Sequence, residues 1–261
     1  MTEKSDGKTE KVSRRKIITT GLATVAGVSG LMVAAKIADR YGLLAPDHGG
    51  ILGAGEALTY GAMRVLTAHH SMAREFNRSE ISKIHPVNGP HPKSESYQRM
   101  ANGNFQDYRL TVDGLVARPT SFSLDELKRM PSRTDITHQA CEEGWSFIAE
   151  WTGVPLSYVL NYVGTQPHAK WAVFHTFQTD WWDSLDMPEV LHPQTLVAYN
   201  MNGDDIPLDY GAPVRLRVPR QLGYKSLKFL TSITITDSLK NVGDGQGSPS
   251  PAAGYSWYAG I

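Results

Sequence analysis

Short stretches of alternating hydrophobic and polar side chains recur along the chain from residue 108 onward. Successive side chains of a strand point to opposite faces of a sheet, so this alternation predicts half-buried β-strands. The first strand covers residues 108–112, and Asp113-Gly114 predicts a tight hairpin turn before a return strand at 115–117. The further predicted strands are 171–177, 196–201, 214–218 and 230–237.

Short helices are predicted between these strands. Ser123 and Glu126 have the spacing of a capping box, which satisfies the first backbone N–H groups of a helix. Pro155 suits the first turn of a helix over 156–162, and one further helix is predicted over 71–80. Short strands with a few short helices between them predict a single α+β domain that is mostly β.

The first forty residues have a different pattern. Arg14 and Arg15 precede an uncharged run over 17–35, which is the arrangement of a twin-arginine secretory signal. This pattern predicts export to the periplasm. Retention as a membrane anchor stays open, because nineteen uncharged residues are long enough to span a bilayer. The predicted division is a signal segment over 1–40, an irregular connector with a short helix over 41–84, and a folded domain over 85–261.

Charge and cysteine content exclude several classes of protein. The 26 basic and 26 acidic side chains balance, so there is no basic excess for binding nucleic acid. A single cysteine excludes an intrachain disulfide, a zinc ribbon, a cysteine-ligated iron–sulfur cluster and a CxxCH haem attachment.

The one cysteine, Cys141, follows a predicted strand and precedes a loop with aromatic residues. A lone cysteine is most often a small buried hydrophobe. In an oxidising compartment a free thiol is a liability unless it is buried, reactive or ligated. Its thiolate is a soft ligand for a transition metal, and most of the other ligands would then come from a cofactor. A cysteine-dependent hydrolase is a weaker alternative, because flanking acids raise a thiol pKa and the nucleophile needs an imidazole base.

Two blocks of sequence resemble the sulfite oxidase superfamily. Residues 140–146, Ala-Cys-Glu-Glu-Gly-Trp-Ser, with Trp-Thr-Gly-Val-Pro-Leu at 151–156, are similar to its molybdenum-cysteine segment. The second block is Gly-Ala-Pro-Val-Arg-Leu at 211–216 with Gly-Tyr-Lys-Ser-Leu-Lys at 223–228. The similarity covers roughly residues 85–240 and is closest to the exported branch that includes periplasmic methionine sulfoxide reductase catalytic subunits.

This resemblance implies a sulfite-oxidase-like molybdopterin-binding fold over 85–261 and a molybdenum-molybdopterin cofactor, with Cys141 as metal ligand and centre of catalysis. Independently of the family, Arg215 offers a planar fork and Lys228 a point charge to a phosphate, although each is also compatible with a solvated surface position. The residues that the resemblance assigns to the pterin and its phosphate are Asn88, Thr176, Tyr210, Arg215, Ser226 and Lys228.

Departures from the family pattern bear on the substrate. Sulfite oxidases carry an arginine just after the cysteine, whereas this chain has Glu142 and Glu143, which would repel a sulfite dianion. Trp181 and Trp182 fall near the family's catalytic tyrosine region. We therefore expect oxygen-atom transfer on a small neutral sulfoxide or N-oxide. The alternatives are a sulfite-oxidising enzyme of the same fold and a non-catalytic pterin-binding scaffold.

The expected partners follow from what the sequence lacks. No haem or flavin motif is present, so electrons would be exchanged with a separate redox partner, for which a membrane cytochrome is one candidate. We expect no nucleic-acid partner. A monomer is expected, because the chain ends soon after the pterin-binding block and lacks the added domain through which sulfite oxidases dimerise.

Overall fold

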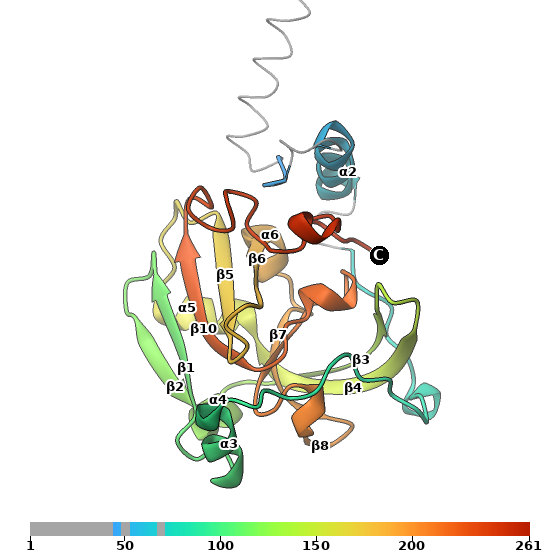
Figure 1. Ribbon diagram of the computed structural model, residues 1–261, viewed down its shortest axis with the longest axis vertical. Coiled ribbons are helices and arrows are strands. Elements are labelled where there is room, and N and C mark those ends of the chain that lie inside the picture. The colour runs from blue at the N-terminus through green and yellow to red at the C-terminus, as the bar shows by residue number, and fades with distance from the viewer. Residues whose placement is uncertain (1–43, 48–52, 67–70) are drawn as a thin grey trace, which may run out of the picture. The chain divides into compact units, whose positions relative to one another are not determined.

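The computed structural model describes residues 44–47, 53–66 and 71–261 (Figure 1). The leader predicted over 1–40 lies outside the described residues. Among the helices of the described part, none is both long and apolar enough to cross a membrane. One compact unit extends from Ala45 to Ile261, so it includes residues that the sequence pattern assigned to a connector.

Two sheets form the framework of this unit. The first has the strand order β2-β1-β10-β5-β6, and the second has the order β3-β4-β7-β8 with β9 paired to β7. β1 and β10 run parallel, and the other pairs of described strands are antiparallel. The first sheet comprises β1 (Arg109–Gly114), β2 (Thr120–Ser123), β5 (Trp171–Thr176), β6 (Trp182–Asp186) and β10 (Leu230–Thr236). The second comprises β3 (Arg133–Ala140), β4 (Ser146–Pro155), β7 (Leu196–Met201), β8 (Asp204–Asp205) and β9 (Arg215–Arg217).

The two sheets share one hydrophobic core. Val112, Phe174 and Ile233 of the first sheet are buried in the same cluster as Val154 and Val197 of the second. In Figure 1 the first sheet stands at the left, while β3 and β4 curve across the lower right. The mostly β, α+β single domain expected from the sequence is therefore confirmed.

The helices are short and cover the ends and edges of the sheets. Ser123 caps α4 as predicted: the backbone N–H of Glu126 donates to its Oγ at 3.1 Å, and its own N–H donates to the Glu126 carboxylate at 2.7 Å. α5 ends at Gly164, whose φ of +73° a residue with a side chain rarely adopts. The described α-helices are α2 (Gly53–Leu66), α3 (Glu95–Asn102), α4 (Leu124–Arg129), α5 (Leu156–Val163) and α6 (Met187–Val190).

Two local predictions were wrong because long-range strand pairing overrides the local pattern. Residues 115–117 do not return beside β1; β2 does, and β1 also pairs with β10, more than a hundred residues away. Gly114 is required by that pairing, because a Cβ there would lie 2.1 Å from the carbonyl oxygen of Ile235. The helix predicted over 71–80 is also absent: Glu75 bridges to Thr137 at the edge of β3, and only a 3-10 turn follows.

Segments from both ends of the described chain pack on β6 and α6. From α2, Tyr60 donates a hydrogen bond to Asp186 at 2.6 Å, and Arg64 pairs with Asp186 and Glu189. From the C-terminal segment, Trp257 is buried edge-on against Tyr60. Residues remote in sequence thus close this side of the domain.

Candidate functional site

A cavity of about 320 Å³ brings together five separate segments of the chain. They are the loop 86–89, the end of β3 with the loop after it (139–147), the loop 178–181, the residues 209–215 that lead into β9, and the segment 223–228. Six of the seven residues predicted for the site line this cavity, and the exception is Thr176. The six are Asn88, Cys141, Tyr210, Arg215, Ser226 and Lys228.

Cys141 sits at the tip of the β3–β4 hairpin. Its backbone N–H donates to the carbonyl of Trp145 at 2.9 Å, and its carbonyl accepts from Gly144 at 3.1 Å. Gly144 has a φ of +89°, which completes a three-residue hairpin loop at little steric cost. This tight loop fixes the side chain of Cys141, which is only 8% exposed, at the wall of the cavity.

The surroundings of the thiol do not suit a free nucleophile. The side-chain amide of Asn88 lies 3.8 Å from Sγ, and the Sγ–H donates to Glu142 at 3.3 Å. Burial first, and the hydrogen bond to Glu142 as well, raise the pKa of Cys141. Within the described residues no histidine hydrogen-bonds to Sγ, so the hydrolase alternative lacks its base.

The two carboxylates after Cys141 occupy different places. Glu142 lines the cavity. Glu143 is exposed, and its carboxylate accepts a hydrogen bond from the indole of Trp145 at 2.6 Å and a longer one from Asn88 at 3.4 Å. Only Glu142 therefore contributes a negative charge to the cavity wall beside Cys141.

Lys228 connects two parts of the cavity rim. Its ammonium donates to the backbone carbonyls of Asn88, Gly89 and Asp209, so it holds the loop 86–89 against the segment before β9. Burial and, after it, the nearby positive charge of Arg215 lower the pKa of Lys228 to about 8.

Two arginines of β9 lie beneath this rim. Arg215 and Arg217 are both buried, with their guanidinium carbons 4.9 and 5.7 Å from the ring centre of Trp151. Arg215 donates to the carbonyls of Tyr210 and Ser226, each at 2.7 Å, while its Nε has no partner within the described structure. Desolvation lowers the pKa of both arginines to about 9.

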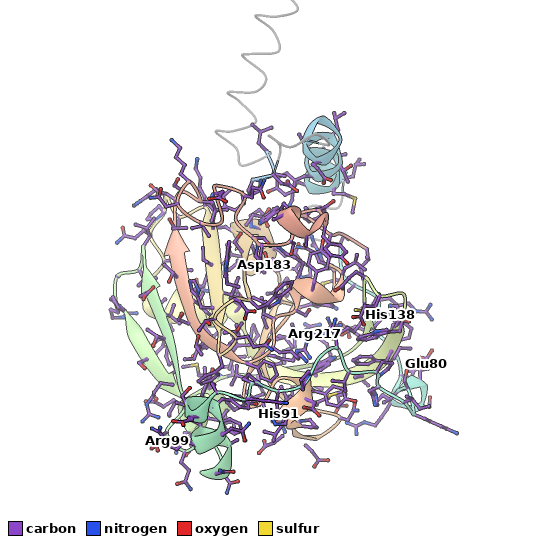
Figure 2. The ribbon with its side chains drawn as sticks, in the orientation of Figure 1. Glu80, His91, Arg99, His138, Asp183 and Arg217 are labelled. Carbon is purple, nitrogen blue, oxygen red and sulfur yellow. The ribbon has the colours of Figure 1, made fainter. Side chains whose placement is uncertain are left out.

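Arg217 was not among the predicted residues, although alternation along β9 places it on the same face as Arg215. It donates to the carbonyl of His138 at 2.6 Å and to the hydroxyl of Ser226 at 3.2 Å (Arg217 and His138 are labelled in Figure 2). Ser226 is thereby held by an arginine, and its hydroxyl also accepts from the backbone N–H of Val218.

Tyr210 and Thr176 have different relations to the cavity. Tyr210 lines it, and its hydroxyl donates to the carbonyl of His85. The hydroxyl of Thr176 lies 2.8 and 2.9 Å from the carbonyl oxygens of Gln178 and Trp181, so it shapes the loop that carries these two lining residues.

Trp181, which the sequence places near the family's catalytic tyrosine region, lines the cavity, and so does Trp145. Trp182 instead packs in the cluster formed with the C-terminal segment. Several lining residues were missed, because the sequence does not show which side chains face the cavity. They are Gln139, Phe147, Gln178 and Tyr224.

Comparison with known proteins identifies the family. Residues 97–241 match the family described as the oxidoreductase molybdopterin binding domain. The chain is 33% identical over 190 residues to a proposed protein-methionine-sulfoxide reductase subunit, YedZ1, of Azospira oryzae, an alignment that covers 71% of this chain and 70% of the relative. The resemblance seen in the sequence is confirmed.

Other relatives are matched over shorter stretches. The protein-methionine-sulfoxide reductase catalytic subunits MsrP of Xanthomonas axonopodis pv. citri and Xanthomonas campestris pv. campestris are 35% and 34% identical over 147 residues. These alignments cover 51% of this chain and 46% of each relative, so the match spans less than half of their length. The solved sulfane dehydrogenase SoxCD of Paracoccus pantotrophus is 28% identical, with a TM-score of 0.48, over 52% of this chain and 40% of that one.

The cavity fits the cofactor that this family binds. Within the described residues no group of three histidine, cysteine or acidic side chains is arranged to hold a metal, so a metal at Cys141 would need most of its ligands from a cofactor. Arg215, Arg217 and Lys228 form no ion pair with a carboxylate in the described structure. Buried positive charge without a counter-charge is costly, and the phosphate of a pterin would supply that charge.

Lys228 provides a test of this anion site. An anion favours the ammonium form, so the affinity of the cofactor-free protein for inorganic sulfate should fall as the pH rises from 7 to 9, through the pKa of about 8. Lys228→Met should weaken sulfate binding at pH 7 by about tenfold and flatten this pH dependence. Isothermal titration calorimetry measures both effects, with exposed Lys240→Met as the matched control. Unchanged affinity and pH profile in Lys228→Met would show that Lys228 contributes nothing to an anion site.

Proposed function

Because the chain belongs to the oxidoreductase molybdopterin binding domain family, we propose that it is an exported molybdenum enzyme that reduces a small neutral sulfoxide or N-oxide. The observation that carries this proposal is the composition of the cavity wall. One thiol, the Glu142 carboxylate and several aromatic rings lie on the side of Cys141. Near β9 lie Arg215 and Lys228, which form no salt bridge within the described structure, together with Asp209, which pairs with His91.

In this proposal Cys141 is the protein ligand of the metal. The hairpin loop fixes its direction, and the amide of Asn88 lies close enough to donate to the sulfur. Arg215 offers its unpartnered Nε–H to the phosphate end of the cofactor, and Lys228, whose ammonium bonds to three backbone carbonyls, adds its positive charge. Ser226 accepts hydrogen bonds from both Arg215 and Arg217. Tyr210 and Thr176, through their hydrogen bonds to backbone carbonyls, position the parts of the cavity wall between Cys141 and the phosphate-binding residues.

When bound, the cofactor supplies two-electron oxygen-atom transfer. The overall reduction of a sulfoxide consumes two electrons and two protons and yields a thioether and water. The aromatic rings of Trp145 and Trp181 give the cavity an apolar wall. The organic groups on the sulfur of a sulfoxide substrate pack against this wall.

Glu142 is the residue that favours a neutral substrate over an anion. Its carboxylate lies beside the Cys141 sulfur, whereas the cations lie at the β9 end of the cavity. A like charge about 5 Å away costs on the order of 3 kcal/mol at an effective dielectric constant near 20. The MsrP relatives are named for methionine sulfoxide, which is a neutral S-oxide at its sulfur, so this name agrees with the chemistry of the cavity.

Electrons come from a separate protein in this proposal. The described residues contain one cysteine, which excludes an iron–sulfur relay within the chain. Relatives named as subunits support a partner, and a membrane cytochrome matches an exported enzyme. The twin-arginine pattern at Arg14 and Arg15 supports export to the periplasm after the cofactor has been inserted.

The choice between sulfoxide reduction and sulfite oxidation is tested by paired steady-state assays at low ionic strength. With a dye as electron donor, the enzyme should reduce methyl sulfoxides and oxidise sulfite poorly. Glu142→Gln should raise kcat/KM for sulfite by about tenfold and leave sulfoxide kinetics nearly unchanged. Exposed Glu143→Gln is the matched control and should alter sulfite kinetics less.

A higher kcat/KM for sulfite than for any sulfoxide in the unmodified enzyme contradicts the proposed substrate. A loaded protein inactive in both assays would favour the scaffold alternative.

Export is tested separately from catalysis. Replacing Arg14 and Arg15 together by Lys should leave molybdenum-loaded protein in the cytoplasm, because the twin-arginine pair is the export signal. Cell fractionation followed by elemental analysis measures this. The unmodified chain is the control, and an equal periplasmic amount of the variant would mean that the leader was misread.

A further inference from the structure

Gln139 is a buried side chain whose carboxamide oxygen, Oε1, is buried and has no hydrogen-bond donor within the described structure. It lies two residues before Cys141 on β3, is 7% exposed, and lines the same cavity. We propose that the Gln139 carboxamide binds the pterin ring system of the cofactor, an inference that rests on the proposed function.

Two other buried glutamines show what a structural role looks like in this fold. Gln194 accepts from the backbone N–H of Ala73 at 2.8 Å and donates back to the carbonyl of Ala73 at 3.1 Å. Gln221 accepts from the backbone N–H of Ala259 at 3.2 Å. Buried polar groups are nearly always paired in this way, and an unpaired one is strongly unfavourable. The Oε1 of Gln139 therefore lacks the kind of partner that Gln194 and Gln221 have.

The position of Gln139 places it in the middle of the site. Alternate side chains of a strand share a face, so Gln139 and Cys141 point to the same side of β3 about 7 Å apart. On the side of Gln139 away from Cys141, Arg217 donates to the carbonyl of the preceding residue, His138, and to the hydroxyl of Ser226. The carboxamide thus lies between the thiol and the cations that would hold the phosphate.

The chemistry of the unpaired atom selects the part of the cofactor. Oε1 is an acceptor and needs an N–H or O–H donor. A phosphate dianion, a dithiolene sulfur and a sulfoxide oxygen are all acceptors, so none of them satisfies it. The pterin ring carries both N–H donors and acceptor atoms, and a carboxamide, which has an acceptor oxygen beside a donor N–H₂ group, is complementary to such a pattern.

The test compares Gln139→Leu with the unmodified chain. Each protein is purified in a cofactor-loaded form and, from a host that cannot make the pterin, in a cofactor-free form. In the cofactor-free protein Gln139→Leu should raise the midpoint of thermal unfolding by about 2–4 °C, because an unpaired buried amide is removed. In the loaded protein the same change should speed release of the pterin about tenfold, because a hydrogen bond to it is lost. Pterin release is followed by fluorescence after oxidation, and molybdenum content by elemental analysis.

Two controls make the result specific. Gln194→Leu removes a paired buried amide and should lower the unfolding midpoint of the cofactor-free protein. Exposed Gln106→Leu should change neither quantity. Destabilisation of the cofactor-free protein by Gln139→Leu, or unchanged pterin release, would overturn the inference. Absence of pterin from the unmodified chain would instead overturn the proposed function, so the two failures are distinguishable.

Discussion

The structure depends on two guanidinium groups that are buried without a salt bridge to any described carboxylate. Arg215 and Arg217 stack on Trp151 and donate to backbone carbonyls and to Ser226, which orients them. The carboxylate of Asp135 attracts Arg217 only from beyond salt-bridge distance. Elsewhere the same domain pairs its buried cations, as Arg64 is paired with Asp186 and Glu189. The difference between these two regions marks the β9 end of the cavity as a place for an anion.

The position of Cys141 relative to Arg215 and Arg217 follows from the pairing of the strands in the second sheet. β9 pairs with β7, β7 with β4, and β4 with β3, so a continuous ladder connects the arginines to the hairpin that carries the thiol. Gly223 packs against the hairpin so closely that a Cβ would lie 3.1 Å from the carbonyl oxygen of Ala140. The distance between the thiol and the anion-binding side chains is therefore set by the sheet and by backbone packing.

Features encoded locally were predictable from the sequence. The capping box at Ser123, the strands β1, β5, β7, β9 and β10, and the position of Cys141 directly after a strand depend on short-range rules, and the structure has them. The parallel pairing of β1 with β10 was not predictable, because nothing near Gly114 indicates a partner beyond residue 230. Gln139 and Arg217 were missed for a related reason. The alternation along a strand predicts on which face of the sheet a side chain lies. Only the fold determines which other residues lie against that face.

The central claim is that Cys141 is the protein ligand of a molybdenum otherwise held by a pterin. X-ray absorption at the molybdenum K-edge tests it most directly, with holoenzyme of the unmodified chain and of Cys141→Ser. The nearly isosteric serine leaves the hairpin in place but replaces a soft thiolate by a hard oxygen ligand. The account predicts one sulfur fewer around molybdenum in Cys141→Ser than in the unmodified protein. An equal number of sulfur neighbours in the two proteins would contradict it.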